Sequence, residues 1–162
     1  MSNSKAYKLP ALDPSSVASS GTNSYPEPFH SRMGKVERRA LGDACELGKM
    51  GVNLVVLEPD AQSALRHWHT LEDEFVYVLN GELTLASDAG EQILTAGMSA
   101  GFPAGRRDGH HLINRSNRPA RFLEIGSRID GDGCFYPDDD MLWIDDEEGW
   151  HAAHKDGRSY EP

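Results

Sequence analysis

Short runs of β-branched and aromatic residues, separated by turn residues, follow one another between residues 52 and 126. Their sequences are VNLVVL, EFVYVL, ELTLA, EQIL, HHLIN and ARFLEIG. Closely spaced short strands of this kind predict a β-sandwich or a β-barrel. No stretch of about twelve residues has a convincing 3.6-residue apolar period, so we expect little helix. The strand runs are not repeated along the chain, which predicts a single barrel.

Turn signals lie between several of these runs. Asn80-Gly81 separates FVYVL from ELTLA, and this dipeptide readily takes the positive φ angles of a two-residue hairpin turn. Asp88-Ala89-Gly90 and the segment 116–119 are further candidates for turns. We therefore expect a β-hairpin at Asn80-Gly81 and two more turns downstream.

The two ends of the chain differ from this middle part. Residues 1–35 are rich in Ser, Asn and Pro and show no periodicity, so we expect an extended N-terminal arm before a barrel at 36–130. Residues 131–162 form an acidic C-terminal extension with ten acidic and two basic side chains. A charge run of this kind favours a solvated tail. Against full disorder, the extension also contains Met141, Leu142, Trp143, Ile144 and Trp150.

Composition narrows the classes of protein further. A chain of 162 residues suits one domain with a core of its own. The apolar runs are far shorter than the roughly 20 residues of a membrane helix, and the first residues form no apolar signal core. A net charge of -10 argues against nucleic acid as a partner. Cys45 and Cys134 are compatible with reduced thiols, so we expect a cytoplasmic protein that binds neither nucleic acid nor membrane.

Histidines and one glutamate supply the candidate chemistry. His67 and His69 are two residues apart, so on a strand their imidazoles project from the same face and can reach one ion. Glu74 opens the apolar strand FVYVL, where a carboxylate is costly unless it is paired or bound to a metal. The next candidates are His110 and His111, which alternate onto opposite faces of their strand.

The spacing of these residues resembles the two motifs of the cupin superfamily. The run His67-x-His69-x4-Glu74-x6-Gly81 is similar to the first motif. The run Gly97-x5-Pro103-x-Gly105, followed by His110-x3-Asn114, is similar to the second motif. The resemblance covers about residues 52–126 and implies an all-β fold, the double-stranded β-helix or jelly-roll barrel.

Carried over by position, the resemblance implies a divalent metal held inside the barrel by His67, His69, Glu74 and His110. Two departures bear on this assignment. The glycine that usually opens the first motif is Ala61 here, and the stretch from Gly105 to His110 is two residues longer than the common pattern. His111 is therefore the alternative fourth ligand.

Three imidazoles and one carboxylate suit a divalent transition metal (Mn, Fe, Co, Ni or Zn) better than Ca or Mg. Four protein ligands on a six-coordinate ion leave positions for water or substrate, which is typical of a working site. The competing interpretation is a barrel whose metal site has become a polar core.

Basic residues near the second motif indicate an anionic ligand. Six arginines and two acidic residues lie between Arg106 and Arg128, in an otherwise acidic chain. Arg106 and Arg107 are the candidate substrate-binding residues, since their loop should overhang the barrel mouth. Solvated surface arginines are an equally good interpretation. Arg66 should point away from the metal face, because it alternates with His67.

The segment HWHTLEDEFVYVLNGE resembles the first motif of cupin-type phosphosugar isomerases. This resemblance implies isomerisation of a sugar or sugar phosphate, with Glu74 as the candidate catalytic base among the side chains. The alternatives are an Fe(II)-type dioxygenase, which uses the same ligands, and a non-catalytic cupin that binds a small ligand.

The same resemblance implies a homodimer. The strand at 74–79 supports this, because Phe75 and Tyr77 alternate with Val76 and make both of its faces apolar. Such a strand must be covered by a second sheet or by a partner.

Overall fold

The computed structural model describes residues 10–21, 23–146 and 149–160, and β-strands dominate this part of the chain. Its one α-helix is the single turn α1 (Leu41–Ala44), with two short 3-10 turns, η1 (Pro14–Ser16) and η2 (His30–Arg32). The expected all-β fold with little helix is confirmed. Among the described residues, none belongs to a helix long and apolar enough to cross a membrane.

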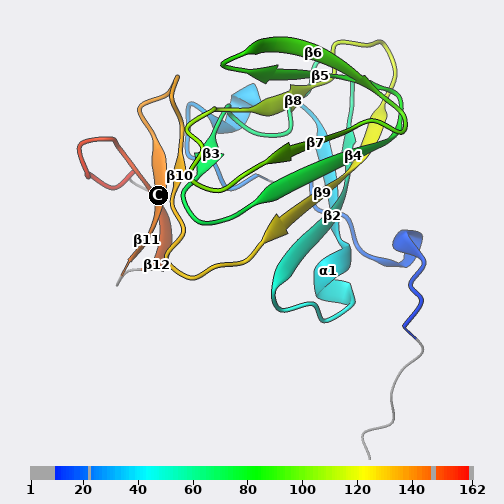
Figure 1. The fold of residues 1–162 in the computed structure, drawn as a ribbon, viewed down its shortest axis with the longest axis horizontal. Coiled ribbons are helices and arrows are strands. Elements are labelled where there is room, and N and C mark those ends of the chain that lie inside the picture. Colours follow the sequence, from blue (N-terminus) through cyan, green and yellow to red (C-terminus); the bar gives the residue numbers. More distant parts are fainter. Residues whose placement is uncertain (1–9, 22, 147–148, 161–162) are drawn as a thin grey trace, which may run out of the picture.

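Two antiparallel sheets face each other to form the barrel, as Figure 1 shows. The larger sheet has the order β1-β2-β9-β4-β7, and the smaller has the order β6-β5-β8. The strands of the larger sheet are β1 (Val36–Ala40), β2 (Met50–Leu57), β9 (Ala120–Ser127), β4 (Glu74–Asn80) and β7 (Ser99–Phe102). Those of the smaller sheet are β6 (Gly90–Thr95), β5 (Glu82–Ser87) and β8 (His111–Ile113).

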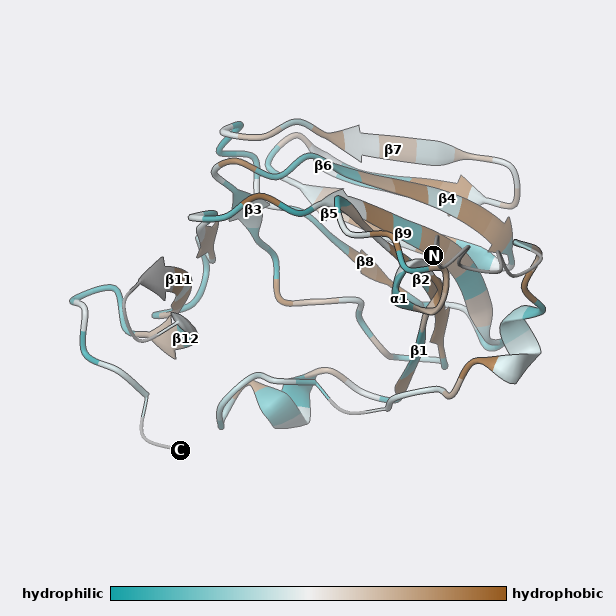
Figure 2. Ribbon diagram, turned by 90° about the horizontal axis from the view of Figure 1, so that it is seen from below, coloured by the Kyte–Doolittle hydropathy of each residue, from teal (hydrophilic) through white to brown (hydrophobic). Residues whose placement is uncertain are grey.

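Alternate residues of these strands fill the space between the sheets. On β4, Val76 and Val78 point inward, while Phe75, Tyr77 and Leu79 on the opposite face are exposed. Every strand of the two sheets except β7 contributes buried residues to the barrel core, and β7 contributes partly buried ones. The buried residues of the barrel core are Val36, Val55, Leu57, Ala61, Val76, Val78, Leu83, Leu85, Leu94, Leu112, Ala120 and Phe122. Figure 2 shows apolar segments concentrated in β2, β4 and β9.

The turn predicted at Asp88-Ala89-Gly90 is confirmed, and it closes a hairpin in which Ser87 pairs with Gly90 across β5 and β6. The hairpin predicted at Asn80-Gly81 is wrong. Strands β4 and β5 belong to different sheets, so at Gly81 the chain passes from the larger sheet to the smaller one and does not form a hairpin. Gly81 does take the positive φ of +85° that its sequence predicted.

The acidic extension is not a solvated tail where the structure describes it. Strands β10 (Cys134–Phe135), β11 (Leu142–Asp146) and β12 (Gly149–Ala153) form a sheet of order β12-β11-β10-β3 with β3 (Trp68–His69). Figure 1 shows this C-terminal sheet beside the barrel. Met141 is fully buried, so apolar burial outweighs the net charge of the segment. Glu147 and Glu148 lie outside the described residues, as do residues 1–9 of the predicted arm.

The arm and the C-terminal sheet meet in a second core. Phe29 and Met33 of the arm pack there with Cys134, Tyr136 and Met141, and with Leu65 from the segment that precedes β3. An isolated bridge also joins Ser20 of the arm to Arg38 on β1. The boundaries predicted at residues 35 and 130 stay predictions.

Arg66 links the C-terminal segment to the barrel. Its side chain forms ion pairs with Asp88, in the β5–β6 turn, and with Asp138 after β10, where the Nε to Oδ2 distance is 2.7 Å. The hydrogen bonds from Arg66 hold the pKa of Asp138 below its ordinary value. Arg66 therefore has a structural role, consistent with its predicted direction away from the histidines.

Gly81 offers a test of the crossing between the sheets. A Cβ at this position would lie 2.9 Å from the Cα of Ala120, whereas a Cβ at Gly97, with a similar φ of +88°, would meet nothing within 4 Å. We expect Gly97→Ala to lower the free energy of unfolding by about 1–2 kcal/mol through backbone strain alone. Gly81→Ala should lower the free energy of unfolding by about 3 kcal/mol or more, because the steric clash adds to the backbone strain. Urea denaturation would measure both values. Equal losses would show that the close approach to Ala120 is unimportant.

Candidate metal centre

The four predicted ligands come together at one end of the barrel. His67 and His110 are paired by an antiparallel bridge, with His67 N to His110 O at 3.1 Å and His110 N to His67 O at 2.8 Å. His69 ends β3, and Glu74 is the first residue of β4. The bridge therefore places two imidazoles side by side, opposite the carboxylate that opens the neighbouring strand.

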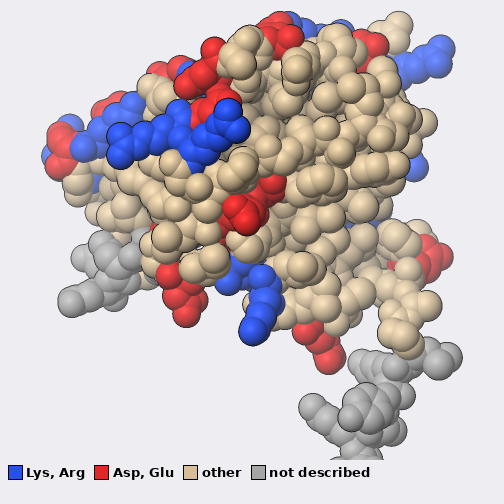
Figure 3. All heavy atoms as spheres, in the orientation of Figure 1, with Lys and Arg blue, Asp and Glu red and all other residues tan. Residues whose placement is uncertain are grey.

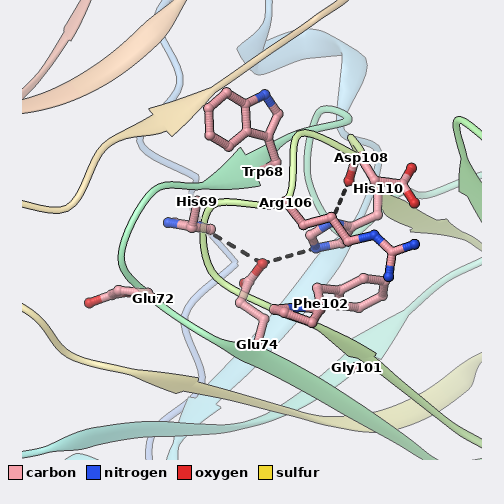
Figure 4. Close-up of a pocket in the computed structure, with 10 residues that line it drawn as sticks. Trp68, His69, Glu72, Glu74, Gly101, Phe102, Arg106, Asp108 and His110 are labelled. Carbon is pink, nitrogen blue, oxygen red and sulfur yellow. Dashed lines mark hydrogen bonds and ion pairs between the residues drawn. The ribbon is translucent and has the colours of Figure 1, made fainter.

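The imidazoles converge on one oxygen of Glu74. Its Oε2 lies 2.9 Å from Nε2 of His110, 3.5 Å from Nε2 of His67 and 3.8 Å from Nε2 of His69. Figure 4 shows His69 and His110 both directed at the Glu74 carboxyl group. We call these four residues the His/Glu cluster.

His110, and not His111, belongs to the cluster. The ring of His110 stacks on Phe102 with centroids 3.5 Å apart, which fixes its orientation towards Glu74. The side chain of His111 points the other way, with its Nδ1 3.0 Å from the carbonyl oxygen of Ala64. The longer loop before His110 has therefore not displaced it.

The far nitrogens of two histidines are held by acceptors. Nδ1 of His67 lies 2.8 Å from the carbonyl oxygen of Leu65, and Nδ1 of His69 lies 2.5 Å from Oδ2 of Asp132. These contacts place a proton on Nδ1 of each ring and turn Nε2 towards the cluster, where it would bind an ion.

Asp132 is a site residue that the sequence did not reveal. It is buried, and its other oxygen accepts hydrogen bonds from the Leu71 backbone N–H at 2.7 Å and from the Thr70 hydroxyl at 3.0 Å. Burial raises the pKa of Asp132, but hydrogen bonds from His69 and the Leu71 backbone outweigh this and keep it below its ordinary value. Asp132 therefore remains an ionised acceptor that orients His69.

The charges of the cluster are mutually dependent. Burial alone would raise the pKa of Glu74, but hydrogen bonds from His110 and His67 hold it well below its ordinary value. Burial alone would lower the pKa of His67, but the hydrogen bond and charge of Glu74 raise it. The protein therefore keeps an ionised carboxylate among imidazoles in a largely buried site.

This arrangement fits a transition metal. Atoms of His67, Glu74 and His110 lie within 4.8 Å of one another, and His67 and His69 form a further such group with Cys134. Imidazole nitrogens with one carboxylate oxygen suit Zn, Fe, Mn, Co or Ni. Burial raises the pKa of the Cys134 thiol.

Two cavities adjoin the cluster. The smaller, shown in Figure 4, has a volume of about 30 Å³, and its lining includes His69, Glu74, His110 and Arg106. The larger has a volume of about 290 Å³, and His67 and His69 are part of its lining. The cluster can thus be reached from more than one side.

The two predicted substrate-binding arginines differ in position. Arg106 lines the smaller cavity, whereas the guanidinium of Arg107 lies over the ring of Trp68, 5.6 Å from its centroid. Glu72 also lines the smaller cavity, and its Oε1 accepts a hydrogen bond from the Ile129 backbone N–H at 2.7 Å. Substrate binding by Arg106 and Arg107 stays a prediction.

Comparisons with known proteins agree with this geometry. A family model described as the cupin domain matches residues 53–126. A crystal structure from Silicibacter pomeroyi, described as a sugar phosphate isomerase from a cupin superfamily, is 41% identical, with a TM-score of 0.89. The match covers 94% of this chain and 97% of that chain. A comparison with curated proteins found no match.

Two further solved structures are similar. For one from Acidithiobacillus ferrooxidans, sugar phosphate isomerase activity is proposed; it is 29% identical, with a TM-score of 0.71, over 80% of this chain and 82% of that chain. A Thermotoga maritima protein, a predicted oxalate decarboxylase, is 22% identical, with a TM-score of 0.59, over 74% of this chain and 99% of that chain. At that identity it shows the fold alone.

Replacement of Asp132 tests whether the cluster is held ready for an ion. We expect Asp132→Asn to weaken Zn²⁺ or Mn²⁺ binding about 10- to 100-fold, because His69 loses the carboxylate that orients it. Isothermal titration of metal-depleted protein would measure this. Asp130→Asn, an exposed neighbour, should leave the affinity unchanged. Equal affinities for all three proteins would mean that Asp132 does not support a metal site.

Proposed function

The chain belongs to the cupin superfamily, and on that premise we propose that it is a metal-dependent isomerase of a sugar or sugar phosphate. The observation that carries the proposal is the convergence of His67, His69 and His110 on the Glu74 carboxylate beside a cavity. The similar Silicibacter pomeroyi structure, described as a sugar phosphate isomerase, supports the choice of reaction.

His67, His69, Glu74 and His110 would hold the metal through their Nε2 and carboxylate atoms. A divalent ion bound there would supply a Lewis acid for the carbonyl oxygen of the substrate. His67 and His69 are kept in position by Leu65 and Asp132, so the nitrogens do not have to reorganise when an ion binds.

An isomerase must also move a proton between adjacent carbons. Glu74 is the side chain proposed as the base from the sequence, but its Oε2 already faces three imidazoles. Glu72 supplies a second carboxylate in the smaller cavity, outside the set of four ligands. We propose that the two carboxylates divide the work. Glu74 would bind the metal, and Glu72, which has an oxygen within 4.8 Å of a ring nitrogen of His69, would exchange the proton at the end of the substrate that reaches His69.

We further propose a cytoplasmic location and a homodimer. Cys45 is exposed, Cys134 is buried and both are free thiols, which suits a reducing compartment. Outside the barrel core, Phe75, Tyr77 and Leu79 of β4 have exposed fractions of 41%, 39% and 44%. In Figure 3 the face over β4 and β7 carries few charged side chains, and a second copy of the chain would cover it.

The metal and the reaction are tested together. Protein purified without chelator should contain about one transition-metal ion per chain and should interconvert aldose and ketose phosphates. His69→Gln should lose the ion and lower turnover by about 100-fold or more, because a metal contributes several kcal/mol to the transition state. His30→Gln, at an exposed position outside the cluster, is the matched control.

Other outcomes discriminate between the functions. A bound ion without turnover of any sugar or sugar phosphate would refute isomerisation and leave the metal site intact. Oxygen uptake by the Fe(II)-loaded protein would instead support the dioxygenase chemistry that the same ligands allow. Absence of metal, persisting after reconstitution with each candidate ion, would refute both.

The dimer is tested by light scattering at micromolar concentration. We expect a particle of twice the 17.8 kDa chain mass. Tyr77→Glu should shift it to the monomer, since a carboxylate would be buried without a partner in an apolar contact. Ile93→Glu introduces the same charge at an exposed position of the smaller sheet, and it should leave the dimer intact. A wild-type monomer would contradict the proposal.

A further inference from the structure

The larger cavity beside the His/Glu cluster is built from parts of the chain that lie far apart in sequence. Its walls come from the N-terminal arm, β1, the segment before β3 and the C-terminal sheet. A volume of about 290 Å³ is near the lower end of the ~300–1,000 Å³ usual for ligand sites. The smaller cavity, at about 30 Å³, holds little more than one or two water molecules.

Among the described residues, Arg38 is the one lysine or arginine that lines this larger cavity. It lies on β1 opposite Val55, whose side chain belongs to the barrel core, so Arg38 faces the interior of the barrel. Its neighbour Arg39 instead donates to the carbonyl oxygen of Val17 in the arm. A partly exposed cationic group thus faces the larger cavity.

The Arg38 guanidinium is positioned but not saturated. One terminal nitrogen donates to the Ser63 carbonyl oxygen, and Nε lies 3.5 Å from Oε2 of Glu124. Glu124 is itself held by the Asn53 side-chain amide, with the nitrogen 3.2 Å from Oε2. Because a guanidinium has five N–H donors in a planar fork, donors remain for a bidentate anion.

Aromatic and hydroxyl groups complete the cavity. The hydroxyl oxygens of Tyr25 and Tyr136 are 3.3 Å apart, their rings meet edge to face, and Trp143 contributes a further lining side chain. Burial raises the pKa of both phenols, so both stay protonated at neutral pH. One hydroxyl donates to the other within the pair, which leaves one O–H for a ligand. Hydroxyl groups and aromatic surface suit a compact polyhydroxylated ligand.

We propose that this cavity is the ligand chamber, and that Arg38 binds the anionic group of a small polyhydroxylated substrate whose other end reaches His67 and His69. This inference rests on the proposed function and deepens it. It transfers anion binding from Arg106 and Arg107, predicted from the sequence, to a residue on β1. Phosphate and carboxylate share the chemistry that Arg38 recognises.

The position of the chamber indicates that residues outside the matched cupin domain determine which ligand is bound. The cupin-domain match covers residues 53–126, whereas Arg38, Tyr25, Tyr136 and Trp143 all lie outside it. The matched segment supplies the His/Glu cluster, and the arm and the C-terminal sheet supply the wall that contacts the rest of the ligand.

The test compares binding of three probe classes to the full-length, metal-loaded protein by isothermal titration. The probes are ketose and aldose phosphates, the sugar acids of matching length, and the corresponding uncharged sugars. We expect Arg38→Gln to weaken binding of an anionic probe about 30- to 100-fold, to leave the uncharged sugars unchanged and to leave the metal content unchanged. Arg106→Gln tests the competing assignment and should change the affinity less than threefold. Arg118→Gln, at an exposed position outside both cavities, is the matched control and should leave the affinity unchanged.

Two more variants keep the test decisive if Arg38→Gln fails to fold because it leaves Glu124 without its cation. Arg38→Lys retains the charge but loses the fork, and should weaken anion binding about tenfold. Ala64→Leu, on the chamber wall, should block every probe class while the metal stays bound.

Each result bears on one of the two proposals. Anion binding that depends on Arg38 supports the chamber even if no isomerase activity is found, and the preferred probe distinguishes phosphate from carboxylate. Loss of anion binding in Arg106→Gln but not in Arg38→Gln or Arg38→Lys would overturn the inference. So would failure of the metal-loaded wild-type protein to bind any anionic probe.

Discussion

Taking a carboxylate out of water costs several kcal/mol unless charges and hydrogen bonds replace the lost solvent. Glu74 meets this cost with three imidazoles, two from the segment just before it and one from the residue that precedes β8. The bridge between His67 and His110 makes two of them neighbours, and the pairing of β3 with the C-terminal sheet places the third. The same contacts that stabilise the buried charge arrange a set of donors that fits a transition metal, so the stability of the barrel end and its chemistry have one origin.

The cluster lies between two hydrophobic cores. One fills the barrel, and the other joins the N-terminal arm to the C-terminal sheet through Leu65, two residues before His67. A disturbance of either core would therefore displace the histidines. The terminal segments pack closely even though one of them is strongly acidic. Met141 and Tyr136 bury apolar surface there, and this burial outweighs the repulsion among exposed carboxylates.

The residues of the His/Glu cluster were predictable from the sequence because the spacing of three of them is local. His67, His69 and Glu74 lie within eight residues, and alternation along a strand already distinguishes His110 from His111. The barrel strands with apolar alternation were equally visible. Arg38 was not, since the strand VERRA shows charge rather than alternation, and Asp132 lies in a Gly-Asp-Gly turn with no spacing relation to His69. The Asn80-Gly81 rule predicted the backbone angle correctly but not its sheet partner, because a turn dipeptide carries no information about which strands pair.

The second core also sets an order of events during synthesis. The ribosome releases the arm and the barrel strands first, while Asp132, Tyr136 and Trp143 are among the last residues to emerge. Until then His69 has no carboxylate to orient it, and the chamber lacks one wall. A chain truncated before residue 132 would lack both the carboxylate that contacts His69 and the cavity wall formed by Tyr136 and Trp143.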